Sequence, residues 1–161
     1  MSKHAPAPPP PFEPEFIEGL RHLFEERIVF NRVIGIRLTD IAAGRVTGRV
    51  EMRPELVGHF SYQRLHGGVI SATLDAMAGV SVMAAIGARH MDEAPARRLE
   101  RFIRLGTIDL RVDYLRQAIG DFFIARGEVM RLGSRVASTR MEFCDASGQL
   151  LATGAAAYIV A

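Results

Sequence analysis

The sequence predicts an α+β fold in which an antiparallel β-sheet wraps around one central α-helix. One observation behind this prediction is a 20-residue segment, residues 68–87, that is almost entirely apolar or small. The other is a series of segments in which apolar and polar residues alternate, two before the apolar segment and four after it. Short turns between strands favour antiparallel neighbours, and 161 residues are enough for one domain with its own core.

The chain begins with a proline-rich stretch, because six of its eight prolines lie within residues 1–14. Such a density is typical of a disordered or polyproline II tail and not of a packed core. We therefore expect one folded domain over residues 15–161.

Before the central helix, the pattern predicts one amphipathic helix and two short strands. Apolar residues recur at helical spacing over residues 16–30, and Asn31 and Gly35 then supply a stop. Residues 36–53 are typical of two strands that turn at Ala43–Gly44.

The apolar segment at residues 68–87 is long enough to cross a membrane as a helix of roughly 30 Å. We reject that interpretation because Asp75 lies in its middle, its ends lack anchoring charges, and strand patterns flank it closely. A helix that is apolar on all sides is otherwise surrounded by its own protein. The segment is therefore predicted to be the core helix, with no membrane insertion.

After the core helix, residues 88–104 form a polar, arginine-rich connection that we expect to be partly helical. Residues 108–114 alternate apolar and charged side chains without interruption, which is typical of a half-buried strand. Further strands are predicted at residues 122–130, 136–143 and 150–160, separated by turns at residues 132–134 and 145–148.

The composition limits the classes of function. Cys144 is the only cysteine, so no disulfide forms within the chain, and a cytoplasmic location is expected. Cys144 has no histidine nearby in sequence, which favours a buried hydrophobic role over a nucleophilic one. The five histidines show no metal-binding spacing, and we expect neither a metal nor a cofactor. No apolar run follows the start, so no signal peptide is visible.

The charge of the chain argues against a nucleic-acid partner, because the net charge is only +2. The arginines are nevertheless concentrated in two clusters, which either form solvated faces or hold the phosphates of a nucleotide-like ligand. The clusters are Arg97, Arg98, Arg101 and Arg104, and Arg126, Arg131, Arg135 and Arg140.

Asp75 is the main candidate for a catalytic group. It is the only ionisable side chain between Gly67 and Ala88, and an unpaired carboxylate inside an apolar helix costs free energy. One interpretation is a structural aspartate that is hydrogen-bonded to nearby backbone or hydroxyl groups. We favour a general base or nucleophile, because isolated ionisable groups of this kind gather at active sites.

A second candidate feature, His66–Gly67–Gly68, directly precedes the core helix. Its glycines let a ligand approach the backbone closely, and the helix start offers unpaired N–H groups to a carbonyl oxygen that gains charge. Gly67 and Asp75 are eight residues apart, which is about 12 Å along a helix. Either they belong to different sites, or one site combines Gly67 of one chain with Asp75 of another, which predicts an obligate homodimer.

These motifs together resemble a known family. His66–Gly67–Gly68, Asp75 nine positions after the histidine, and the segment Gly106–Arg116 are similar to the hotdog-fold thioesterases of the phenylacetate-pathway (PaaI) type. The resemblance covers about residues 30–160 and is nearest to bacterial thioesterases that act on medium- and long-chain acyl-CoA. It implies the hotdog fold and the hydrolysis of acyl-CoA, with coenzyme A as part of the substrate and not as a cofactor.

The resemblance also implies roles for individual residues. The amide of Gly67 polarises the thioester carbonyl, and His66 helps to position it. Asp75 of the partner chain attacks the carbonyl or activates water, and Thr107 orients this water or carboxylate. Gly68 is expected to lie against the substrate.

The same resemblance implies a homodimer whose sheets join edge to edge, often paired again into a tetramer, with two sites at the interface. Arg131, Gly133 and Arg135 match a basic turn that commonly contacts coenzyme A phosphates. One position departs from the family pattern, because Phe60 stands where many relatives carry an asparagine that holds the attacking water. His59 and Gln63 are the candidates to replace it.

Two other functions are compatible with parts of this pattern. Hydratase or dehydratase chemistry also occurs on hotdog folds, although its sites pair a histidine with a polar partner at a different spacing. A non-catalytic acyl-CoA-binding module is the other alternative, and the substitution at Phe60 is the feature that supports it.

Overall fold

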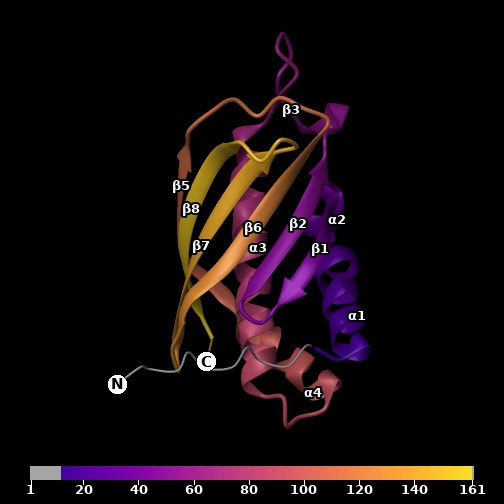
Figure 1. Cartoon of the computed structure of the whole chain (residues 1–161), viewed down its shortest axis with the longest axis vertical. Coiled ribbons are helices and arrows are strands. Elements are labelled where there is room, and N and C mark those ends of the chain that lie inside the picture. The colour runs from indigo at the N-terminus through magenta and orange to yellow at the C-terminus, as the bar shows by residue number, and fades with distance from the viewer. Residues whose placement is uncertain (1–11, 161) are drawn as a thin grey trace, which may run out of the picture.

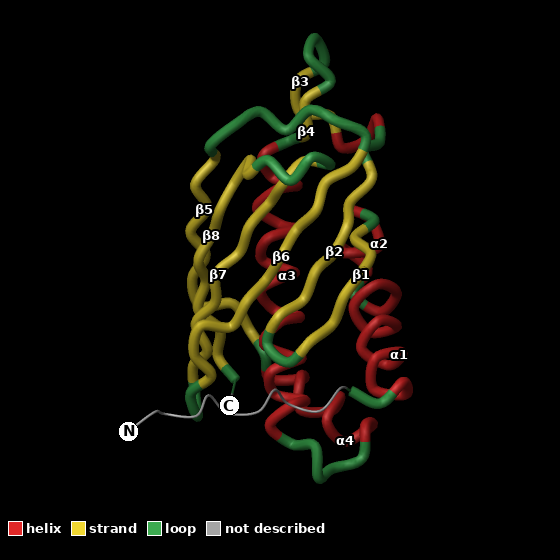
Figure 2. The backbone as a smooth tube through the Cα atoms, in the orientation of Figure 1, coloured by secondary structure: helices red, strands yellow, loops and turns green. Residues whose placement is uncertain are grey.

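The structure, a computed structural model, describes residues 12–160. A six-stranded antiparallel sheet curls around one long helix, and shorter helices lie beside and below it (Figure 1). The tube view shows the same arrangement, with the long helix behind the strands (Figure 2). The predicted α+β class, a sheet wrapped around a central helix, is confirmed.

The predicted N-terminal helix is divided into three pieces. Helix α1 (Pro14–His22) continues into a π-helical turn at Leu23–Arg27, and α2 (Val29–Ile34) follows. Gly35 ends α2 in the left-handed conformation, with φ of 81°, as predicted. The prediction that Asn31 acts as a stop is wrong.

Asn31 lies inside α2 and is buried. Its side-chain amide donates a hydrogen bond of 3.0 Å to the carbonyl of Phe24 in the π-helical turn. This bond satisfies a carbonyl that the wider π turn leaves without a helical partner, so the asparagine continues the helical segment instead of ending it.

The predicted tail falls mostly on residues 1–11, which lie outside the described residues. Of its last three residues, Phe12 is only 8% exposed and packs in the core, and Pro14 is the first residue of α1. The folded domain therefore begins slightly before the predicted boundary at residue 15.

The sheet has the strand order β1-β2-β6-β7-β8-β5. All six strands lie where the alternation placed them, and Gly44 turns the first hairpin with φ of 72°. β5 pairs with β8 and not with β6, so β5 is an edge strand. The strands are β1 (Ile36–Ala42), β2 (Arg45–Glu51), β5 (Gly106–Tyr114), β6 (Phe122–Leu132), β7 (Val136–Asp145) and β8 (Leu150–Ile159).

The central helix α3 (Gly67–Arg89) is the core of the molecule. It is long and apolar enough to cross a membrane, yet 67% of its most apolar window is buried inside the fold. The sheet lies directly on it, since a Cβ added at Gly127 of β6 would be only 2.3 Å from the carbonyl oxygen of Met77. The prediction of a core helix is confirmed.

Two connections complete the fold. A small hairpin of β3 (Val57–His59) and β4 (Arg64–Leu65), which the sequence did not predict, leads into α3. The arginine-rich connection is partly helical, as predicted, with α4 (Pro95–Glu100) and a 3-10 turn at Arg101–Arg104.

Candidate active site

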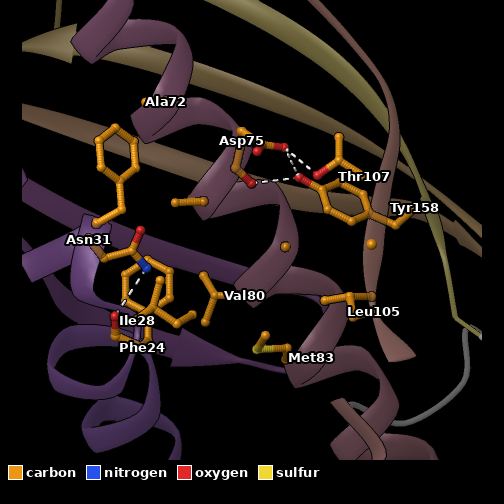
Figure 3. A pocket seen from close by; sticks show the side chains of 14 residues that line it. Phe24, Ile28, Asn31, Ala72, Asp75, Val80, Met83, Leu105, Thr107 and Tyr158 are labelled. Atoms are coloured by element: carbon orange, nitrogen blue, oxygen red, sulfur yellow. Dashed lines mark hydrogen bonds between the residues drawn. The ribbon is translucent and has the colours of Figure 1, made fainter. Parts of the chain in front are cut away.

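The Asp75 carboxylate projects from α3 and is held by two hydroxyl groups (Figure 3). Thr107, at the start of β5, donates a hydrogen bond of 3.0 Å to Oδ1. The hydroxyl of Tyr158 on β8 donates to the same oxygen. Among residues 12–160, no group donates to Oδ2. One carboxylate oxygen is thus fixed, and the other is free to react.

Tyr158 is a functional candidate that the sequence analysis missed. It is buried, and its hydroxyl also lies 2.6 Å from the backbone carbonyl of Asp75. Burial and the neighbouring carboxylate raise the pKa of Tyr158 well above its usual value, so the phenol stays a protonated donor. One feature of the sequence could have indicated Tyr158, since it is a lone tyrosine at an inward position of an alanine-rich strand. A buried tyrosine needs a hydrogen-bond partner for its hydroxyl.

A cavity of about 270 Å³ opens beside Asp75. The region around α2 forms one wall, α3 forms the floor, and the first residues of β5 form the other wall (Figure 3). Asp75 and Tyr158 are the titratable groups of the described lining, and the rest is mainly apolar. Its largest apolar side chains are Phe24, Ile28, Phe30, Val80, Met83 and Leu105.

The start of α3 carries the second predicted feature. His66 caps the helix, and its Nδ1 accepts a hydrogen bond of 2.8 Å from the Gly68 amide. A neutral ring in this state carries its proton on Nε2, which leaves that nitrogen as a donor. The Gly67 amide donates to no residue within 12–160. Two donors are therefore available here, as an oxyanion hole requires.

Gly67 and Asp75 are not brought together within one chain. Both lie on α3, which separates them by about 12 Å. Each of them nevertheless contacts the edge strand β5, because the hydroxyl of Tyr114 donates to the Gly67 carbonyl at 3.0 Å and Thr107 donates to Asp75. The two halves of the predicted site thus lie near opposite ends of β5.

The predicted phosphate-contacting residues lie elsewhere. Arg131, Gly133 and Arg135 flank the turn between β6 and β7, and both arginines are exposed. Arg89, the last residue of α3, donates to the Gly133 carbonyl at 3.2 Å. The turn is therefore about 21 Å from Asp75, because Arg89 follows Asp75 by fourteen residues along α3.

The position that departs from the family pattern lies at the tip of the β3–β4 hairpin. Phe60 is 83% exposed. The Gln63 amide is bonded to the Phe60 carbonyl at 2.8 Å, and the His59 ring packs against Phe60 and Tyr62. Neither candidate replacement contacts Asp75 of the same chain.

Cys144 is buried, and burial raises the pKa of its thiol, as expected of a structural residue. Across residues 12–160, no three His, Cys, Asp or Glu side chains are grouped to hold a metal ion.

Comparison with known proteins identifies the family. The family model described as "Thioesterase superfamily" matches residues 62–152, which is more than half of the chain. The chain belongs to the thioesterase superfamily. The medium/long-chain acyl-CoA thioesterase YigI of Escherichia coli is 34% identical over 138 residues, covering 86% of this chain and 89% of the relative. The same protein from Salmonella typhimurium matches equally well.

A solved structure supports this assignment of the thioesterase fold. The Shewanella oneidensis protein related to the thioesterase superfamily has a TM-score of 0.84 at 34% identity, and the match covers 93% of this chain and all of that one. The predicted hotdog fold and the resemblance to bacterial medium- and long-chain acyl-CoA thioesterases are therefore confirmed.

Proposed function

We propose that this thioesterase hydrolyses medium- to long-chain acyl-CoA, with Asp75 as the reacting carboxylate. The observation that carries the proposal is the asymmetry of that carboxylate. Thr107 and Tyr158 hold Oδ1, whereas Oδ2 is free beside an apolar cavity. A carboxylate oxygen that is shielded from water without a hydrogen-bond partner costs free energy. A purely structural aspartate is therefore expected to have partners for both oxygens.

The chemistry follows from this geometry. As a general base, Oδ2 takes a proton from water while the water oxygen bonds to the thioester carbon. The tetrahedral intermediate then collapses, the carbon–sulfur bond breaks, and the thiolate takes the proton from Asp75. Alternatively, the same oxygen attacks the carbon itself, which breaks the carbon–sulfur bond and gives a mixed anhydride and a thiolate. Water then hydrolyses the anhydride and supplies the proton that the thiolate takes. Both routes release a free acid and coenzyme A.

The negative charge on the carbonyl oxygen needs donors, which the start of α3 supplies. The free amide of Gly67 and Nε2 of His66 are the proposed donors, and Gly68 provides backbone that a substrate can approach closely. Because Gly67 and Asp75 are too far apart in one chain, this mechanism requires Asp75 of the partner subunit.

The edge strand β5 offers the way to assemble such a site. It pairs on one side only, and its exposed side chains include Ile108 and Tyr114. Antiparallel pairing of β5 with its copy about a two-fold axis places the Thr107 end of one strand beside the Tyr114 end of the other. Thr107 contacts Asp75 and Tyr114 contacts Gly67, so the pairing brings the two halves together. We extend this proposal to a homodimer that pairs again into a dimer of dimers.

The substrate assignment rests on the cavity and on the relatives. The apolar lining beside Asp75 suits a hydrocarbon tail, and the similar YigI proteins are named for medium- and long-chain acyl-CoA. Coenzyme A enters as part of the substrate, and Arg131, Gly133 and Arg135 are the proposed contacts for its phosphates. Such a role fits fatty acid metabolism in the cytoplasm.

A non-catalytic acyl-CoA-binding module is the second candidate function. The observation that favours it is the exposed Phe60 at the position where many relatives place a water-binding asparagine. Binding of acyl-CoA without turnover would identify this case.

The proposed function is tested by thiol release from acyl-CoAs of increasing chain length, together with phenylacetyl- and benzoyl-CoA. Asp75→Asn keeps an acceptor for Thr107 and Tyr158 but removes the reacting oxygen, so kcat should fall at least about a hundredfold with little change in KM. Asp40→Asn, an exposed aspartate on β1, is the matched control. An unchanged kcat in Asp75→Asn would refute the mechanism.

A further inference from the structure

The cavity beside Asp75 has a polar side chain in its wall that lies apart from the carboxylate. Thr107 and Tyr158 also line the cavity, but both donate to Asp75, so their hydroxyl protons are already in use. Asn31 of α2 lines the same cavity from the α2 wall (Figure 3). The remaining side chains of the described lining are apolar. Asn31 is therefore a separate polar point within an apolar wall.

The orientation of the Asn31 amide is fixed by its hydrogen bond. Nδ2 donates to the Phe24 carbonyl at 3.0 Å, and only the nitrogen end of the amide is able to do so. The oxygen Oδ1 is therefore turned away from that carbonyl and toward the cavity (Figure 3). No residue within 12–160 donates a hydrogen bond to Oδ1. A hydrogen-bond acceptor thus faces the cavity without a protein partner.

The structural role of Asn31 explains only its donor. The bond to Phe24 satisfies a carbonyl of the π-helical turn, for which an N–H group is sufficient. This bond makes no use of Oδ1. The acceptor is therefore a property of the cavity and not of the packing between the two helical segments.

This acceptor affects which acyl chains the cavity holds well. Asn31 is 4% exposed, so a chain that fills the cavity separates Oδ1 from water. A plain hydrocarbon chain leaves the oxygen unpaired, which costs binding free energy. A chain that carries a donor at this point replaces the water and keeps the hydrogen bond. The cavity is therefore able to select acyl groups by a hydrogen bond as well as by their length.

The charge of the lining indicates which donor fits. Asp75 and Tyr158 are the titratable groups of the described lining, and both lie at the end of the cavity where the thioester reacts. An ammonium group near Asn31 would have no carboxylate partner, and an unpaired buried charge costs free energy. A hydroxyl group is neutral and supplies the proton that Oδ1 lacks. The favoured ligand is therefore an acyl group with a hydroxyl on its chain.

We propose that Asn31 is a specificity-determining residue whose Oδ1 accepts a hydrogen bond from a hydroxyl on the acyl chain of the substrate. This inference rests on the proposed acyl-CoA hydrolysis at Asp75, because the acyl chain must occupy this cavity. The thioester lies at Asp75, the chain crosses the apolar part of the cavity toward α2, and its hydroxyl meets Asn31 there. Hydroxyacyl-CoA thioesters are thus the preferred substrates among acyl-CoAs of equal length.

The first experiment measures thiol release by the wild type from acyl-CoAs of one chain length. The set contains decanoyl-CoA and its derivatives with a hydroxyl on the third, the fifth or the last carbon, with enantiomers kept separate. At least one hydroxylated member should have a kcat/KM about tenfold above that of decanoyl-CoA, as one neutral hydrogen bond in an apolar site provides. A wild type that hydrolyses decanoyl-CoA at least as efficiently as every hydroxylated member would overturn the proposal.

Two variants separate the acceptor from the packing. Asn31→Leu and Asn31→Asp both remove the amide that donates to Phe24, and only Asn31→Asp keeps an oxygen acceptor. The preference for the hydroxylated substrate should therefore disappear in Asn31→Leu and persist in Asn31→Asp. Val80→Ala, which changes an apolar part of the same cavity, is the control and should alter both substrates by the same factor. A preference that survives in Asn31→Leu, or that is lost in both variants, would contradict the role of Oδ1.

A binding measurement keeps this inference separate from the proposed function. Asp75→Asn is expected to bind acyl-CoA with little turnover, so calorimetric titration compares the affinities directly. The preferred hydroxyacyl-CoA should bind about tenfold more tightly than decanoyl-CoA, and the further substitution Asn31→Leu should make the two affinities equal. If the wild type releases thiol from no acyl-CoA, the proposed function fails. The same titration of the wild type then decides the inference, and equal affinities across the set would overturn it.

Discussion

At the scale of single residues, the environment of Asp75 explains how one carboxylate is held beside an apolar cavity. Thr107 and Tyr158 donate to Oδ1 and hold the carboxylate in one orientation without covering Oδ2. The Tyr158 phenol remains protonated because burial and the carboxylate raise its pKa. We assign Tyr158 the role of a positioning residue, since it acts through Asp75.

Tyr158→Phe removes this donor and keeps the ring. We expect kcat to fall about tenfold with little change in KM, because a hydrogen bond to a charged group is lost. Steady-state kinetics that separate kcat from KM check this expectation.

Tyr62→Phe, at an exposed tyrosine of the β3–β4 hairpin, is the control for this experiment. A kcat of Tyr158→Phe that equals that of the wild type would show that Tyr158 serves packing alone.

At the scale of elements, Arg98 helps to attach the arginine-rich connection to the N-terminal helix. Arg98 of α4 is fully buried, donates to the Glu13 carboxylate at 2.5 Å, and lies 4.5 Å from the centre of the Phe16 ring. This contact lowers the pKa of Glu13. It also fixes α4 against α1, so the 3-10 turn that carries Arg104 has a defined position.

Arg98→Ala should therefore destabilise the protein, whereas its neighbour should not matter. We expect the free energy of unfolding to drop by about 2–4 kcal/mol, as for other large buried side chains cut back to alanine. Arg97→Ala should change it by less than about 0.5 kcal/mol, because Arg97 is exposed. Urea unfolding of both variants provides the comparison, and equal effects would contradict this role of Arg98.

At the scale of the whole molecule, the proposed mechanism gives each chain two half-sites and not one site. α3 holds Gly67 and Asp75 about 12 Å apart, so the proposed mechanism needs a second copy to supply the complementary half. The proposed dimer through β5 thus links assembly to activity.

Mixed dimers test this link. Gly67 is the first residue of α3, where proline fits the helix, and His66 before it is already extended with ψ of 134°. Gly67→Pro therefore removes the amide donor with little strain, and Gly67→Ala is the control that keeps it. Dimers of Gly67→Pro alone or of Asp75→Asn alone should be inactive. Purified heterodimers should regain about half of the wild-type activity, since one site then has both wild-type groups. Heterodimers that stay inactive would place both groups within one chain.

The sequence by itself determined the order of the elements, the central helix and the local motifs. Periodicity and turn residues such as Gly35, Gly44 and Gly148 are properties of neighbouring residues, so they are visible without the fold. For the same reason, the spacing from His66 to Asp75 was enough to predict that the two halves of the proposed site lie apart within one chain.

Only the tertiary structure decided which distant residues meet. Tyr158 reaches Asp75 across 83 residues because β8 lies between β7 and β5, and a shift of the strand by one residue would turn its side chain to the other face. The arginine-rich connection looked uniform in sequence, yet packing buried Arg98 and left Arg104 exposed. Contacts of this kind depend on register and on the packing of separate elements, which local patterns do not encode.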